Sequence, residues 1–169
     1  MKDNTVLTPH FQLREFTESA TARKHGIKNE PTAEAVENLR RLCIHTLEPL
    51  REKLGLPMII TSGYRCKELN EIIVHAARKS QHLVGCAADF YVGGSGSVAG
   101  MRVTHRELLI QAFRLIITEP DIDFDQLIIY PSFIHVSYVS KERNRHQITK
   151  ANGQGMYCAL SRAQALAIS

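Results

Sequence analysis

The sequence predicts an α+β fold, a single domain in which N-terminal helices pack on a mainly antiparallel sheet. Helical periodicity dominates the early part of the chain, and short β-branched runs cluster later, with one further helix inserted among them. Helices followed by clustered strands are typical of the α+β class, whereas regular alternation would indicate a parallel sheet. Because the 169 residues contain neither an internal repeat nor a low-complexity linker, we expect one domain over residues 1–169.

Two helices are predicted in the N-terminal part. A short one spans about residues 13–25 and ends at Gly26, since glycine readily adopts the left-handed conformation that closes a helix. A longer one starts at the entry signals Pro31 and Thr32 and repeats apolar residues at steps of three or four. We expect it to be kinked or divided near Pro49, which lacks the N–H that a helix interior uses.

One more helix is predicted among the strands, and the C-terminal tail is left with two alternatives. The helix starts at Thr104, whose side chain can form a capping box with Glu107. Its inward face is expected to carry Leu109, Ala112, Phe113 and Ile116. Residues 150–169 form a C-terminal tail, and its alanine-rich last part is expected to be a short helix or a disordered end.

Four short strands are predicted, at residues 58–62, 86–92, 126–130 and 133–138. The two-residue connection Pro131–Ser132 makes the last two strands a hairpin, in which His135 pairs with Ile128. Side chains alternate between the faces of a strand, so Tyr130 shares the face of His135, and Asp125 is expected on the opposite face.

Composition limits the function before any motif is considered. The formal charge of +4 and the pI near 9.0 favour an anionic partner, such as nucleic acid or the bacterial wall. Four cysteines without C-x-x-C spacing indicate neither a zinc ribbon nor a redox pair, so buried free thiols are expected. No apolar run is long enough to span a membrane, and the first residues lack the apolar core of a signal peptide. We therefore expect a protein made in the cytoplasm without a signal peptide.

An aspartate within an apolar run points to a site. Asp89 lies in a predicted strand made otherwise of Cys, Ala, Phe, Tyr and Val, where a carboxylate is costly unless a cation, a donor network or a metal pairs with it. Two imidazoles and a carboxylate can hold a catalytic zinc, and His82, Asp89 and His135 would supply them. Cys86 points away from Asp89 by alternation and is a poor ligand. Spacing alone also allows His135 to be a hydrogen-bonded core histidine and Asp89 a turn or network residue.

Three segments carry a resemblance to a known family. They are SGYRCKELN at residues 62–70, SQHLVGCAADF at 80–90 and FDQLIIYPSFIHVSY at 124–138. The pattern S-x-H-x-x-G-x-A-x-D is matched at Ser80, His82, Gly85, Ala87 and Asp89. Together these segments resemble the zinc D-Ala-D-Ala carboxypeptidase family, in its branch of small single-domain enzymes. The resemblance covers about residues 10–148 and implies the fold that these peptidases share with hedgehog domains.

The resemblance also implies roles for particular residues. His82, Asp89 and His135 would hold Zn²⁺. Arg65 would bind a substrate carboxylate, for which a planar guanidinium is well suited, and Ser80 would contact the substrate backbone. A surface ion pair for Arg65 and a loop cap for Ser80 are the structural alternatives.

One position departs from the family pattern. Where the branch commonly has a glutamate that takes a proton from the metal-bound water, this chain has Tyr130. A tyrosine with an ordinary pKa of about 10 is a poor base but a suitable hydrogen-bond donor to a developing oxyanion. Tyr130 is therefore the catalytic candidate at this position, and the identity of the general base stays open.

These inferences predict a zinc-dependent metallopeptidase that hydrolyses stem peptides of bacterial peptidoglycan, as a D-Ala-D-Ala carboxypeptidase or an endopeptidase. Without a signal peptide it would act on the cell wall after release, as a phage or prophage lysin does. The alternative is a catalytically weak or inactive zinc-containing module that binds cell-wall peptides, which the missing glutamate supports. No nucleic-acid partner is expected, because the basic run KERNRH at residues 141–146 is of a kind that usually forms a solvated surface.

Overall fold

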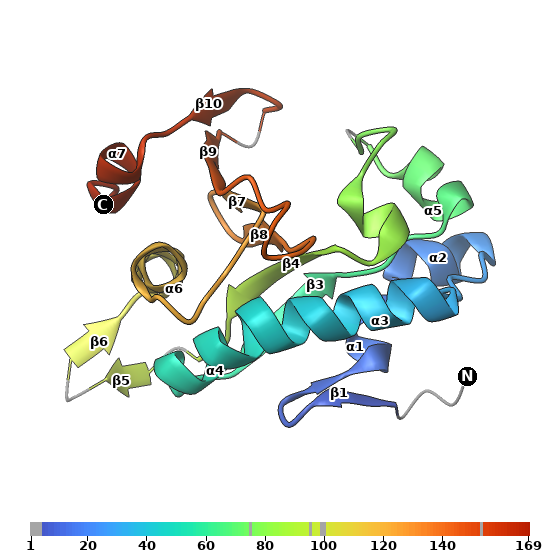
Figure 1. Ribbon diagram of the computed structural model, residues 1–169, viewed down its shortest axis with the longest axis horizontal. Helices are drawn as coiled ribbons and strands as arrows, with labels where there is room; N and C mark the ends of the chain where they lie inside the picture. The colour runs from blue at the N-terminus through green and yellow to red at the C-terminus, as the bar shows by residue number, and fades with distance from the viewer. Residues whose placement is uncertain (1–4, 75, 95, 99–100, 153) are drawn as a thin grey trace.

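A six-stranded sheet in the order β10-β9-β7-β8-β4-β3 is the central element of the fold (Figure 1). Its strands are β3 Met58–Ser62, β4 Ala87–Val92, β7 Gln126–Ile129, β8 Ile134–Ser137, β9 Gln147–Ala151 and β10 Tyr157–Ala159. Neighbouring strands are antiparallel except β7 and β9, which run parallel. The computed structural model describes residues 5–74, 76–94, 96–98, 101–152 and 154–169. The predicted α+β class with a mainly antiparallel sheet is confirmed.

Helices and two small hairpins surround this sheet. The helices are α1 Leu13–Thr17, α2 Ala20–His25, α3 Ala33–Leu42, the π-helical turn η1 Cys43–Leu47, α4 Glu48–Leu54, α5 Lys67–Ile72, the 3₁₀ turn η2 Gln81–Val84, α6 His105–Thr118 and α7 Arg162–Leu166. The hairpins are β1 Val6–Thr8 with β2 Phe11–Gln12, and β5 Gly96–Val98 with β6 Met101–Val103. Within the described residues, every helix is too short or too polar to cross a membrane.

The N-terminal helices differ in part from the prediction. A single helix over residues 13–25 is wrong, because the chain leaves the helical conformation at Glu18 and Ser19 caps a new helix by accepting a hydrogen bond from the Ala22 N–H. The predicted end at Gly26 is confirmed by its positive φ of 65°. The division near Pro49 is also confirmed, since η1 separates α3 from α4 and leaves Pro49 in the first turn of α4, where its missing donor costs little.

The third predicted helix is confirmed as α6. Thr104 and Glu107 form the expected capping box. The four residues expected on its inward face, Leu109, Ala112, Phe113 and Ile116, are all buried.

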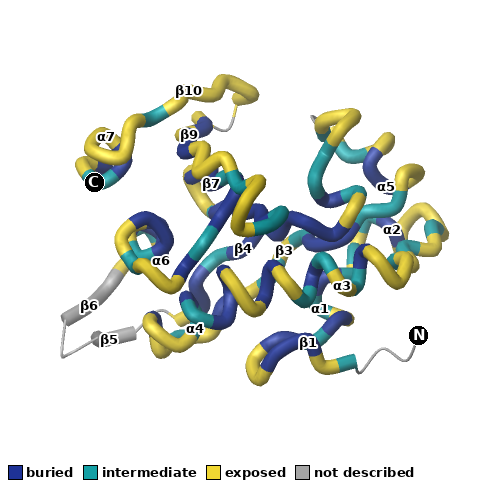
Figure 2. Tube along the Cα trace, viewed as in Figure 1, coloured by how far each residue is buried: buried dark blue, intermediate teal, exposed yellow. Residues whose placement is uncertain are grey.

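The two faces of the sheet differ in character. One face joins the hydrophobic core through Ala88, Phe90, Leu127, Ile129, Ile134 and Val136. Helices α3, α4 and α6 contribute Leu39, Leu50 and Leu109 to the same core, which Figure 2 shows in dark blue along the inner sides of the helices and strands. The opposite face carries Asp89 and His135, which are paired across β4 and β8. Alternation along the strands therefore separates the core from a polar site.

The C-terminal tail is part of the sheet. Strand β9 adds to β7 in parallel, and β10 forms a hairpin with β9. Of the two alternatives for its last part, a short helix or a disordered end, the structure has the helix, α7. The Arg114 guanidinium donates to the Ile168 carbonyl at 2.7 Å, which fixes the last residues on α6. Strands β9 and β10 were not predicted.

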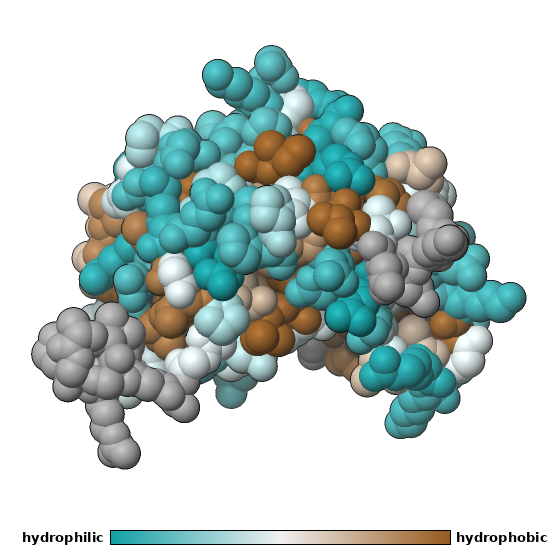
Figure 3. Space-filling view, turned by 90° about the horizontal axis from the view of Figure 1, so that it is seen from below, coloured by the Kyte–Doolittle hydropathy of each residue, from teal (hydrophilic) through white to brown (hydrophobic). Residues whose placement is uncertain are grey.

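Exposed apolar side chains are dispersed over the surface. Figure 3 shows one face of the molecule, on which hydrophobic residues form several separate groups among hydrophilic ones. Scattered apolar residues are normal on protein surfaces. The polar face of the sheet is thus the more informative place to look for a site.

Candidate metal centre

The turn before β4 fixes the first histidine. Ser80 accepts a hydrogen bond from the His82 N–H at 3.3 Å, and Gly85 ends η2 with a positive φ of 74°. The His82 Nδ1–H donates to the Gly63 carbonyl at 2.6 Å. Because Nδ1 carries the proton, Nε2 presents its lone pair to the sheet, which is the state that a metal ligand needs. Only 2% of His82 is exposed, so its ring has little freedom to turn.

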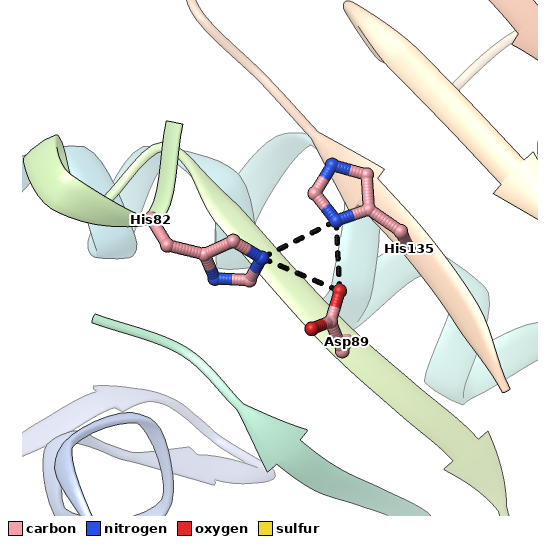
Figure 4. A group of neighbouring side chains, drawn as sticks. All are labelled: His82, Asp89 and His135. Carbon is pink, nitrogen blue, oxygen red and sulfur yellow. Dashed lines mark hydrogen bonds and ion pairs between the residues drawn. The ribbon is translucent and has the colours of Figure 1, made fainter. Parts of the chain in front are cut away.

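Asp89 and His135 meet the His82 ring from adjacent strands (Figure 4). The Asp89 Oδ1 lies 2.7 Å from the His135 Nδ1 and 3.3 Å from the His82 Nε2. The two ring nitrogens are 3.3 Å apart. The three residues predicted from the sequence are therefore brought together, with one donor atom from each pointing at a common centre.

The donor set fits a zinc ion. A tetrahedral ion with bonds of about 2.0–2.1 Å has its ligand atoms roughly 3.3 Å apart, and two sides of the observed triangle have this length. The third side has the length of a hydrogen bond between His135 and Asp89. Among the described residues, these are the His, Cys, Asp and Glu side chains that converge in this way. They also line a cavity of about 1190 Å³, which leaves room for water and substrate beside them.

The electrostatics of the cluster favour the protonation states of metal ligands. Burial alone would raise the pKa of Asp89, but the His82 and His135 imidazoles beside it bring that pKa well below its usual range. Burial lowers the pKa of His82, which favours the neutral imidazole. A carboxylate and a neutral imidazole are the forms that bind a metal ion.

Arg65 lies against the cluster. Its Nη2 donates to the Asp89 Oδ2 at 3.0 Å and its Nε donates to the Ser62 hydroxyl at 2.9 Å. The alternative of a surface ion pair does not describe it, because only 11% of its side chain is exposed. Within the described part of the chain, Arg65 Nη1 has no hydrogen-bond partner. One edge of the guanidinium thus remains available to a ligand in the cavity that Arg65 lines.

Ser80 lines the same cavity. Its hydroxyl oxygen caps η2, as the structural alternative for this residue expected. A hydroxyl that accepts one hydrogen bond can still donate another. Its contact with substrate therefore stays a prediction.

Tyr130 also lines the cavity with the three candidate ligands. Its backbone N–H donates to the Phe133 carbonyl at 2.9 Å, and its ring stacks on Phe133 with the ring centroids 4.2 Å apart. The Tyr130 hydroxyl lies 3.1 Å from the Tyr157 hydroxyl. Burial and this hydrogen bond raise the pKa of Tyr130, so its hydroxyl stays protonated and can donate a hydrogen bond.

Asp125 lies on a different face of the sheet from the one that strand alternation predicted. Its carboxylate lines the cavity and accepts a hydrogen bond from the Gln81 amide at 2.9 Å, next to His82. The prediction of the opposite face is wrong because Asp125 precedes the first residue of β7, where strand alternation does not yet hold. Asp125 is 1% exposed, and the Arg145 guanidinium donates to its two oxygens at 2.9 and 2.6 Å. Burial opposes its charge, but these donors keep the pKa of Asp125 below its usual value.

The basic run at residues 141–146 supplies these partners. Arg145 binds Asp125, while Asn144 and His146 bind the carboxylate of Asp123. The sequence offered no signal for this pairing, because the acids and the basic run lie on different segments. The run therefore has a structural role beside the cavity.

Imidazole and carboxylate donors that converge at an open cavity are a ligand set that metal-dependent hydrolases use. A comparison with protein families identifies the class more specifically. The model of the peptidase M15 family matches residues 9–113. The chain belongs to this family, whose members are zinc peptidases of the D-Ala-D-Ala carboxypeptidase type. The matched span includes Arg65, His82 and Asp89, whereas His135 lies beyond it. A comparison with curated proteins gave no match.

Proposed function

We propose that the protein is a zinc-dependent peptidase that hydrolyses peptide bonds in the stem peptides of bacterial peptidoglycan. The observation that carries this proposal is the convergence of His82, Asp89 and His135 at a cavity, in a chain that belongs to the peptidase M15 family. The proposed site of action is the cell wall, which the protein would reach after release from the cytoplasm.

The residues around the cavity have distinct parts in the proposed reaction. A bound zinc ion would polarise the carbonyl of the cleaved bond and lower the pKa of a water molecule to about 7. Gly63 holds the His82 ring in the orientation of a ligand. Arg65 binds a carboxylate of the stem peptide through the free edge of its guanidinium, and Ser80 donates a hydrogen bond to the peptide backbone. Tyr130 donates to the carbonyl oxygen as it gains negative charge.

Release of amino groups from purified peptidoglycan tests this function. The zinc-loaded protein is expected to release new amines, and treatment with a chelator should abolish the release. Mass spectrometry of the products then identifies the bond, and loss of terminal D-Ala would establish the carboxypeptidase type. Binding of wall material by zinc-loaded protein without any new amine would overturn the proposal in favour of a binding module.

Tyr130→Phe is expected to lower kcat by about a hundredfold with little change in KM, because one donor to the developing oxyanion is lost. The raised pKa of Tyr130 supports this donor role rather than that of a base. Steady-state kinetics on a soluble stem peptide provide the measurement. An unchanged kcat would remove Tyr130 from the reaction.

The binding-module alternative gains its support from the same residue, because Tyr130 stands where the family commonly has a glutamate. It makes a different prediction for two variants. The wild-type protein and Tyr130→Phe would both release no amine, while Tyr130→Glu would create activity by supplying a carboxylate base. Activity in the wild-type protein excludes this alternative.

A further inference from the structure

Basic side chains outnumber acidic ones along the cavity of the metal cluster. Among its described lining residues are two carboxylates, those of Asp89 and Asp125, and both accept hydrogen bonds from an arginine. The same lining holds four cationic side chains, those of Arg65, Lys79, Arg143 and Arg145. The cavity therefore has an excess of positive charge, in keeping with the formal charge of +4 of the whole chain. A concave site lined by one sign of charge attracts ligands of the opposite sign.

A buried carboxylate fixes one of these cations beside the cavity. The Nε and Nη2 of Arg145 donate to the two oxygens of Asp125 at 2.9 and 2.6 Å. Within the described part of the chain, the Arg145 Nη1 has no hydrogen-bond partner, and 56% of the side chain is exposed. The guanidinium is thus held along one edge and open along the other, an arrangement that suits the binding of a carboxylate.

Two further cations lie near this guanidinium. Lys79 and Arg143 are exposed and line the same cavity. Each is two residues along the chain from a residue that binds Asp125, since Gln81 and Arg145 both donate to that carboxylate. No hydrogen bond or ion pair joins the Lys79 ammonium or the Arg143 guanidinium to another residue that the structure describes. We call Lys79, Arg143 and Arg145 the cationic cluster.

The cationic cluster and Arg65 lie on opposite sides of the metal cluster. Arg65 follows the edge strand β3, whereas Asp125 precedes β7 and Arg145 precedes β9. Strands β4 and β8, which carry two of the candidate ligands, lie between them. Asp125 comes three residues before Ile128, the strand partner of His135, so it is roughly 10 Å from that pair along the strand. About three residues of an extended peptide cover this distance.

We propose that the cationic cluster is a substrate subsite that binds a second carboxylate of the peptide, on a side chain about three residues before the cleaved bond. The free edges of Arg143 and Arg145 donate to this carboxylate, and Lys79 adds positive charge beside them. The inference rests on the proposed function, in which Arg65 binds another carboxylate of the stem peptide. With one carboxylate at each side, the peptide lies across the metal cluster. The subsite makes the protein selective for acidic stem peptides over neutral ones.

Calorimetric titration with two synthetic peptides tests the subsite. Both are N-acetylated five-residue alanine peptides that end in D-Ala-D-Ala, with glutamate as the second residue in one and glutamine in the other. This places the acidic side chain three residues before the last bond. Chelator-treated protein is used so that neither peptide is hydrolysed. At low ionic strength the glutamate peptide is expected to bind about tenfold more tightly, since hydrogen bonds between charged groups are the stronger ones. Added salt should reduce this ratio, because it screens exposed charges.

A double variant, Lys79→Gln with Arg143→Gln, removes two cations of the cluster and leaves the ion pair of Arg145 intact. It is expected to lower the ratio of the two affinities about fivefold. The matched control is Arg23→Gln with Lys24→Gln, which removes the same charge from exposed residues on α2, outside the cavity lining. The control should leave the ratio unchanged.

Equal affinities for the two peptides would overturn the subsite, as would a ratio that the cavity variant does not change or that the control lowers equally. Inorganic phosphate that binds more tightly than the glutamate peptide would overturn the assignment to a peptide carboxylate. A preference for glutamate in a protein that releases no amine from peptidoglycan would retain the subsite and reject the proposed hydrolysis. Amine release without this preference would retain the hydrolysis and reject the subsite.

Discussion

His135→Ala is expected to reduce the hydrolysis of peptidoglycan peptides by at least about a thousandfold. His135 contributes one of the three donor atoms that converge at the cavity, and its Nδ1 lies 2.7 Å from the Asp89 Oδ1. Loss of one ligand weakens metal binding, and a metal ion contributes several kcal/mol of transition-state stabilisation, or about tenfold in rate per 1.4 kcal/mol. Amine release and zinc content per chain should fall together.

A matched control separates this effect from a general loss of histidine. His25→Ala changes an exposed residue at the end of α2 and should leave both zinc content and hydrolysis unchanged. Circular dichroism checks that each variant is folded. Hydrolysis by His135→Ala within tenfold of the wild-type rate would show that the ion, or the reaction, depends on other groups.

Gly85→Ala is expected to lower the free energy of unfolding by about 3 kcal/mol or more. The positive φ of Gly85, 74°, costs a residue with a side chain about 1–2 kcal/mol. In addition, a Cβ at this position would lie 2.3 Å from the backbone oxygen of Ala35 on α3, and backbone cannot move aside cheaply. Because Gly85 ends the turn that carries His82, the variant should also bind zinc more weakly.

Gly26→Ala is the matched control for this prediction. Gly26 has a similar φ of 65°, but a Cβ there would meet no atom within 4 Å. Its substitution should therefore cost only the conformational strain, about 1–2 kcal/mol. Urea unfolding of both variants measures the difference, and equal losses of stability would show that α3 does not approach the turn as closely as described.

The cluster could be predicted because strand geometry is regular where its residues lie. The two-residue connection Pro131–Ser132 fixes the register of β7 and β8, and the predicted pair of His135 and Ile128 is confirmed. The position of Asp89 in an apolar run indicated a partner for its charge, which proved to be two imidazoles and Arg65. Most of the site could thus be predicted from short strands with regular alternation and one clear turn between them.

Other features could not be predicted from the sequence because they depend on contacts between distant segments, which local patterns do not encode. Asp125 lies just outside β7, so strand alternation gave the wrong face, and its partner Arg145 comes from a distant segment. Strand β9 was missed because it mixes polar and apolar residues and joins β7 in parallel. The break between α1 and α2 depends on Ser19 capping a new helix within a pattern that reads as continuous.

The most direct test of the central claim is to locate the ion by anomalous diffraction at the zinc absorption edge. We expect one zinc ion per chain, bound to the Nε2 of His82, the Oδ1 of Asp89 and the Nδ1 of His135, the three atoms that converge in Figure 4. An ion bound elsewhere, or none in protein crystallised with zinc, would contradict the assignment of this cluster as the catalytic metal site.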